Sequence, residues 1–92
     1  MIEKEFKVTT KLGLHARPAS LFVQTGSRHL CKVTVTKHHN GEEMVVNGKS
    51  VMGLMMLAAA HGETLKVALE GPDEDEAMRA FEKLFARKFD ED

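Results

Sequence analysis

Four short apolar segments constrain the fold most, because three of them alternate apolar with polar residues, as a strand with one buried face does. They are residues 2–9, 31–36, 44–46 and 65–70. Between the second and third segments lies Asn40-Gly41, a strong signal for a tight hairpin turn. The pattern therefore predicts four strands, with the second and third joined as a hairpin.

Three other segments place apolar residues at helical spacing. They are residues 16–26, 51–60 and 73–88. Ser50 is the expected N-cap of the second helix, and Gly62 is its expected end. The acidic run 73–76 suits the first turn of the third helix, where the helix dipole favours negative charge. The predicted order is β-α-β-β-α-β-α, which favours an α+β two-layer sandwich with the helices on one face of the sheet.

Length, charge and cysteine content exclude several classes of protein. The chain has 92 residues with no linker or repeat, so residues 1–92 are expected to form a single domain. Its 13 Lys and Arg against 14 Asp and Glu give a net charge of −1, which argues against a nucleic-acid partner. The longest apolar run, 54–60, is too short for membrane insertion. A single cysteine, Cys31, and a charged start without a secretory signal favour a cytoplasmic setting.

One histidine, His15, lies where chemistry is favoured, between Gly13 and an expected helix start. Unpaired backbone N–H groups and the positive end of the helix dipole attract anions at such a place. Arg17, two residues further on, carries a guanidinium that matches phosphate oxygens. His15 is therefore a candidate nucleophile that takes a phosphoryl group. The alternative is that His15 only caps the helix.

The other four histidines need no chemical role. His38 and His39 flank the predicted turn, and adjacent residues on a strand point to opposite faces, which makes them a poor metal-binding pair. His29 and His61 lie at expected helix C-termini, where a positive charge is mildly favourable. We expect neither a metal site nor a cofactor.

Ser50 and the helix that follows it have two interpretations each. As an N-cap, Ser50 contributes about 1 kcal/mol to stability. A phosphate on the same hydroxyl would also be favoured by the helix N-terminus. Leu54, Leu57 and Ala58 can face the sheet, whereas Met52, Met55, Met56 and Ala59 lie largely elsewhere on the helix. Such methionines form either a flexible docking surface or a loosely packed part of the core.

Two sequence motifs resemble the HPr family, the histidine-containing phosphocarriers of the bacterial phosphoenolpyruvate-dependent sugar phosphotransferase system. Gly13-Leu14-His15-Ala16-Arg17-Pro18-Ala19 is similar to the active-site segment of that family. Asn47-Gly48-Lys49-Ser50-Val51-Met52-Gly53-Leu54-Met55 is similar to the segment around its regulatory serine. The resemblance covers essentially the whole chain. It implies an open-faced sandwich in which an antiparallel sheet of strand order 1-4-2-3 is covered on one side by three helices.

The resemblance also implies a role for each matching residue. His15 accepts a phosphoryl group on Nδ1 from phosphorylated enzyme I and passes it to a IIA domain, while Arg17 steadies the group. Ser50 is the target of an ATP-dependent HPr kinase/phosphorylase. The docking surface includes the side chains Val51, Met52 and Met55. The protein is expected to be a monomeric carrier that forms a covalent phosphohistidine and not an enzyme.

Two alternatives within the family and one outside it remain. The extended, charged ending 85–92 and the segment 55–59 are similar to proteobacterial relatives, including carriers of the nitrogen-related branch. A regulatory binding module would keep Ser50, but relatives of that kind lack the active histidine. A self-contained enzyme has no support, because no nucleotide-binding loop or nucleophile–base pair is present. Leu12 departs from the family pattern, since relatives often carry a small polar residue there.

Overall fold

Four strands form one antiparallel sheet in the order β1-β4-β2-β3. The computed structural model describes residues 1–91. Its elements are β1 (Ile2–Lys7), α1 (Ala16–Ser27), β2 (Lys32–His39), β3 (Glu42–Asn47), α2 (Val51–Leu57), β4 (Thr64–Glu70), α3 (Glu74–Ala86) and the 3-10 helix η1 (Lys88–Asp90). The predicted element order and the strand order implied by the resemblance are both confirmed.

The hairpin between β2 and β3 lies where Asn40-Gly41 predicts it. His39 pairs with Glu42, so the two residues between them form the whole turn. Asn40 and Gly41 have φ values of +51° and +80°, the left-handed conformations that such a two-residue turn requires. Asn and Gly tolerate this region of the backbone map better than other residues, which explains why the chain reverses here.

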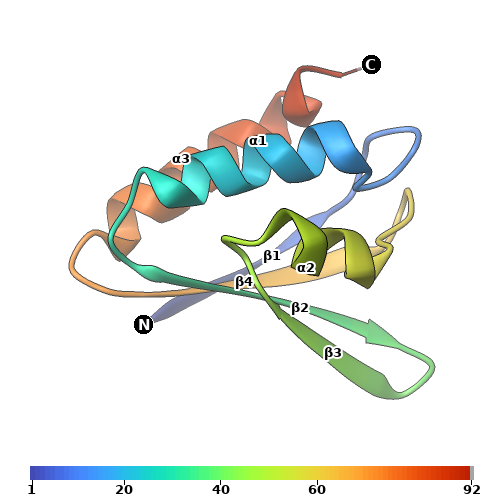
Figure 1. Cartoon of the computed structure of the whole chain (residues 1–92), viewed down its shortest axis with the longest axis horizontal. Coiled ribbons are helices and arrows are strands. Elements are labelled where there is room, and N and C mark those ends of the chain that lie inside the picture. The colour runs from blue at the N-terminus through green and yellow to red at the C-terminus, as the bar shows by residue number, and fades with distance from the viewer. Residues whose placement is uncertain (92) are drawn as a thin grey trace.

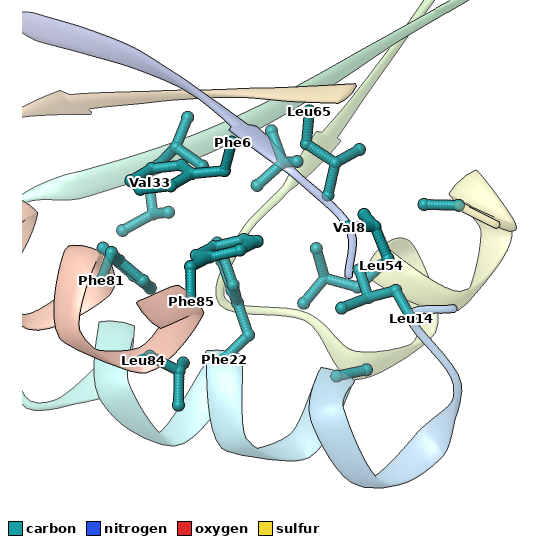
Figure 2. Close-up of a cluster of buried hydrophobic side chains, with 14 of the residues drawn as sticks. Phe6, Val8, Leu14, Phe22, Val33, Leu54, Leu65, Phe81, Leu84 and Phe85 are labelled. Atoms are coloured by element: carbon teal, nitrogen blue, oxygen red, sulfur yellow. The ribbon is translucent and has the colours of Figure 1, made fainter. Parts of the chain in front are cut away.

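The three α-helices cover one face of the sheet, and Figure 1 shows α1 and α3 side by side in that layer. Between the layers lie phenylalanine side chains from both sides (Figure 2). The Phe6 ring stacks on Phe85 with centroids 4.3 Å apart, and Phe22 lies 4.5 Å from Phe81. Phe22 and Phe81 are completely buried, as the helical spacing predicts. Each such side chain removes a large apolar area from water, so this layer supplies most of the stabilisation.

The second helix is shorter than the sequence pattern predicts. Residues 51–60 were expected to be helical up to Gly62, but α2 ends at Leu57 and Ala58 adopts a left-handed conformation. The turn reverses two expectations: Ala58, expected to face the sheet, is exposed, and Ala59, expected to lie off the sheet, is buried. The carbonyl of Ala59 accepts a hydrogen bond from Leu14 N–H at 2.8 Å, a contact that a longer helix would prevent. Tertiary hydrogen bonding therefore ends the helix early.

The chain turns back on itself after α3. Lys88, Phe89 and Asp90 have φ values of +53°, +54° and +59°. Phe89 is only 2% exposed and meets the edge of the Phe85 ring at 4.8 Å between centroids. Burial of a phenylalanine contributes about 1.5–3 kcal/mol, which offsets part of the strain of the three left-handed residues, each of which costs about 1–2 kcal/mol. The last residues of the described chain are thus held against the body of the protein. Within residues 1–91, no helix has the length and hydropathy needed to cross a membrane.

Asp73 at the start of α3 makes folding stability sensitive to acid. Its carboxylate accepts hydrogen bonds from the backbone N–H groups of Leu30 and Cys31 at 2.8 and 2.9 Å. These bonds, with a smaller contribution from His29, hold the pKa of Asp73 below its usual value. A depressed carboxyl pKa adds stability above the unfolded-state pKa of about 3.9, and this stability is lost as the pH falls through the folded-state pKa.

We therefore expect Asp73→Asn to lower the free energy of unfolding at pH 7 and to make the loss of stability below about pH 4 less steep. Urea unfolding across a pH series measures both effects. Asp75→Asn is the matched control, since Asp75 is exposed on the same helix turn. Equal acid profiles for Asp73→Asn and the wild type would contradict the assignment.

Candidate functional site

The loop before α1 is fixed by contacts on both sides of Gly13. Thr10 donates a hydrogen bond from Oγ1 to the Gly13 carbonyl at 2.7 Å, and Gly13 N–H returns one to the Thr10 carbonyl at 3.1 Å. Leu14 is buried, and its N–H bonds to Ala59. Gly13 has a φ of +73°, and a Cβ there would lie 2.4 Å from the Ala59 carbonyl oxygen. Only glycine fits this position, and the hydrogen bonds of Thr10 and Leu14 on either side of it fix the position of His15.

His15 occupies the N-cap position of α1, but its ring does not cap the helix. Its carbonyl accepts the Ala19 N–H at 3.0 Å, and Pro18 has no N–H. The amides free to face an anion at this helix start are therefore those of Ala16 and Arg17. The sequence predicts several such groups, and the structure places two beside His15. Of the two interpretations of His15, capping by the side chain is ruled out.

The ring of His15 contacts the C-terminal segment. Its Nε2 lies 3.0 Å from Oε1 of Glu91, and Oε2 of the same carboxylate lies 3.8 Å from Nη1 of Arg17. His15 is one-third exposed, whereas the Arg17 side chain is 77% exposed. Figure 1 shows η1 beside the start of α1, which is the arrangement that these contacts require.

These residues surround an open hollow of about 470 Å³. Its lining is formed by Lys11, Leu12, His15, Arg17, Asp90 and Glu91. Three of these side chains carry positive charge or take it up on protonation, and two are acids. The hollow is therefore open to solvent, and side chains of both charges surround the histidine.

A second hollow, of about 310 Å³, lies between His15, Leu12 and Met55. Leu12 is 79% exposed, and Met52, Met55 and Met56 are 76%, 46% and 65% exposed. The prediction that methionines of this helix face solvent is confirmed, so loose core packing is ruled out for them. Thr10 holds the loop through the Gly13 carbonyl, whereas Leu12, where relatives often carry a small polar residue, is an exposed apolar side chain.

Ser50 caps α2 as the sequence predicts. Its Oγ accepts the Gly53 N–H at 3.0 Å, and its own N–H donates to the Asn47 carbonyl at 3.1 Å. Next to it, Lys49 reaches the His29 carbonyl at 2.8 Å. Ser50 is partly exposed, and Val51 is only partly exposed because it packs against the core. The exposed apolar surface beside Ser50 therefore consists mainly of methionine side chains.

A buried lysine stabilises the turn after α2, whose Ala59 carbonyl accepts the Leu14 N–H. Lys37 belongs to β2, and its side chain is 9% exposed. Its Nζ lies 3.4 Å from both the Ala58 carbonyl oxygen and Oε1 of Glu63. Glu63 also accepts the Ala60 N–H at 2.6 Å, and this bond, with the Lys37 ammonium, holds the pKa of Glu63 below its usual range. The ion pair ties the turn after α2 to the sheet.

The remaining candidate side chains lie away from the hollow. His38 and His39 are 63% and 65% exposed at the hairpin, each near a glutamate. His61 follows the left-handed turn and does not end a helix as expected. Burial, with the nearby Asp73 carboxylate, raises the pKa of the Cys31 thiol, which keeps it protonated. No cluster of metal-binding side chains forms in the part of the chain that the structure describes.

Sequence reasoning missed two features of the site. Glu91 meets His15 across 76 residues of chain, and no local pattern encodes such a contact. The one signal was Phe89, an apolar residue beyond the helix among charged neighbours, which indicates that the tail packs back. Lys37 was also missed, because its position on the buried face is visible only in the continued alternation from Val33 and Val35.

Comparison with known proteins agrees with this geometry. The family model described as "PTS HPr component phosphorylation site" matches residues 2–87. Phosphocarrier protein HPr of Xylella fastidiosa is 46% identical over 92 residues, covering 100% of this chain and 99% of the relative. The crystal structure of HPr-C-His from Thermoanaerobacter tengcongensis has a TM-score of 0.87 at 41% identity and covers 100% of this chain and 99% of its own. A structure of an HPr dimer from the same organism has a TM-score of 0.71 at 42% identity, covering 97% and 98%.

The match extends over nearly the whole chain, in sequence and in fold. It includes the histidine loop, the serine at the start of α2 and the strand order of the sheet. The chain belongs to the HPr family of phosphocarrier proteins of the phosphotransferase system.

Proposed function

We propose that this chain carries a phosphoryl group on Nδ1 of His15, taking it from phosphorylated enzyme I and giving it to a IIA domain for sugar uptake or regulation. The observation that supports this most is the position of His15 at the start of α1, in an open hollow that also holds Arg17. The ring contacts Glu91 through Nε2, so Nδ1 is the nitrogen that remains to accept the phosphoryl group.

The proposed transfer needs little from the protein beyond position and charge. The Nδ1 lone pair attacks phosphorus, and the new N–P bond forms as the bond from phosphorus to the donor atom breaks. The leaving atom of the donor keeps that electron pair. Arg17 and the two free amides of α1 face the equatorial oxygens. An open hollow suits this chemistry because donor and acceptor must approach the phosphorus in line.

The exposed methionines supply the proposed docking surface, which we define as Met52, Met55 and Met56. Together with the neighbouring Val51, they lie on the helix whose far end lines the hollow beside His15. Flexible thioether side chains adapt to different partners, as a carrier with a donor and an acceptor requires. The working form is the monomer, since each partner uses the same surface. The unpaired, buried Cys31 is compatible with the reducing cytoplasm, where enzyme I would phosphorylate the chain.

The proposal is tested by incubating the chain with phosphoenolpyruvate and purified enzyme I and weighing the intact protein. We expect one phosphoryl adduct that acid removes, because phosphohistidine hydrolyses in acid and phosphoserine does not. A parallel incubation with ATP and an HPr kinase/phosphorylase tests the alternative. If enzyme I from several sources gives no adduct and the kinase gives an acid-stable one, the chain is a regulatory switch acting through Ser50.

Ser50 is proposed as a site of negative regulation. Its hydroxyl lies at the start of the helix that carries the docking surface. A negative charge there introduces repulsion and a desolvation cost against an approaching enzyme I. We expect Ser50→Asp, which preserves a good N-cap, to slow phosphorylation of His15 by enzyme I about ten-fold or more. Rapid-quench phosphorylation assays at fixed ionic strength measure this rate.

Ser27→Asp is the matched control, because Ser27 is exposed at the opposite end of α1 from His15. Ser27→Asp changes the net charge of the chain by the same amount as Ser50→Asp. The rate of His15 phosphorylation in this control should stay close to that of the wild type. Equal slowing in both variants would mean that net charge alone matters. An unchanged rate in Ser50→Asp would remove the regulatory role.

A further inference from the structure

We propose that Glu91 is a positioning residue for His15, holding the ring in the tautomer whose Nδ1 is free to attack phosphorus. This inference rests on the proposed phosphoryl transfer and adds a residue to it from the C-terminal segment. It is carried by the 3.0 Å contact between Glu91 Oε1 and Nε2 of His15.

The direction of the hydrogen bond follows from the chemistry of the two groups. An ionised carboxylate only accepts hydrogen bonds, so Nε2 of a neutral ring must carry the proton when the two are in contact. The lone pair of that ring then lies on Nδ1. Among residues 1–91 the ring makes this one hydrogen bond, and it does not cap α1. Glu91 is therefore the group that selects the tautomer in the described part of the chain.

The contact is held by packing as well as by charge. Phe89 is buried against Phe85 and fixes the tail two residues before Glu91. The Glu91 side chain is only 16% exposed, and its second oxygen faces Arg17 at 3.8 Å. Asp90, the neighbouring acid, turns to Arg87 at 3.0 Å instead. Up to residue 91, the tail thus presents the Glu91 carboxylate to the histidine.

The same carboxylate suits the phosphorylated state. When Nδ1 gives its lone pair to phosphorus, no proton needs to leave the ring, because the Nε2–H stays in place. The ring then carries positive charge, and Glu91 compensates it from the side opposite to the new N–P bond. On donation the pair returns to Nδ1 as the N–P bond breaks. A carboxylate that orients a histidine and stabilises its cation in this way is a recurring device in enzymes.

The test uses Glu91→Gln, which keeps the length of the side chain and removes its charge. A glutamine amide can donate to Nε2 and so favours the tautomer with the proton on Nδ1, which blocks attack. We expect the rate of phosphoryl acceptance from enzyme I to fall about ten-fold, as for loss of a charge-assisted hydrogen bond. We also expect ¹⁵N NMR of the neutral His15 ring to show more of the Nδ1–H form.

Two controls separate this role from a structural one. Glu42→Gln removes the same charge from the exposed end of β3 and should change neither the rate nor the tautomer. The urea midpoint of Glu91→Gln should match that of the wild type, so that slower transfer cannot come from unfolding.

The outcomes distinguish this inference from the function on which it rests. The NMR measurement needs no phosphoryl donor, so it tests the contact in any case. If the wild type accepts a phosphoryl group and Glu91→Gln does so equally fast with an unchanged tautomer, the positioning role is wrong and the carrier function stands. If the wild type accepts none, the carrier function fails and the role of Glu91 fails with it.

Discussion

Replacement of His15 by alanine is expected to abolish acid-labile phosphorylation by enzyme I. The ring is the imidazole of the hollow that Arg17 and the start of α1 border, and alanine leaves no ring nitrogen to take the phosphoryl group. The variant should fold normally, because the ring is one-third exposed and makes no capping bond. Intact mass after incubation with phosphoenolpyruvate and enzyme I, with and without acid, measures the effect.

His38→Ala is the matched control for this experiment. His38 is 63% exposed at the hairpin and lies outside the hollow, so its loss should leave the adduct unchanged. An acid-labile adduct that survives in His15→Ala and disappears in His38→Ala would place the phosphoryl group elsewhere and overturn the assignment.

The second large effect is expected for Gly13→Ala. The substitution forces a left-handed conformation on alanine, which costs about 1–2 kcal/mol. It also brings a methyl group to 2.4 Å from the Ala59 carbonyl oxygen, a distance that the backbone must relieve by moving. We expect the free energy of unfolding to fall by about 3 kcal/mol or more in total, since strain and overpacking add. Urea unfolding followed by circular dichroism measures the loss.

Gly41→Ala separates the two contributions to that loss. Gly41 has a similar φ of +80°, but no atom lies within 4 Å of a Cβ built there. It should therefore cost only the conformational strain, about 1–2 kcal/mol. Similar losses in the two variants would mean that the close approach of Gly13 to Ala59 does not constrain the loop. We also expect folded Gly13→Ala to be phosphorylated more slowly than the wild type, because the altered loop displaces His15.

Local patterns were sufficient for most of the fold. The Asn40-Gly41 turn, the Ser50 cap and the apolar stripes of α1 and α3 all depend on residues close in sequence, and each was predicted correctly. The end of α2 was not, because Ala58 is an ordinary helix former. What stops the helix is the hydrogen bond from Leu14 to the Ala59 carbonyl, and that contact joins segments far apart in the chain.

The difference between local patterns and contacts of distant segments also explains which parts of the site the sequence predicted. His15 and Arg17 were predicted because a histidine and an arginine at a helix start have a chemical meaning on their own. Glu91 has none until the fold brings it to the ring, 76 residues away. Lys37 likewise gains its role only when β2 places it beside Glu63. Long-range polar contacts of this kind do not follow from periodicity.

As a carrier, the chain must both accept and donate a phosphoryl group, and one relay measurement tests both steps directly. The phosphorylated chain is separated from enzyme I and phosphoenolpyruvate and then mixed with a purified IIA domain. We expect the IIA domain to gain the phosphoryl group while the chain returns to its unmodified mass. A phosphoryl group that stays on the chain, or that is lost to water while the IIA domain gains nothing, would contradict the carrier function.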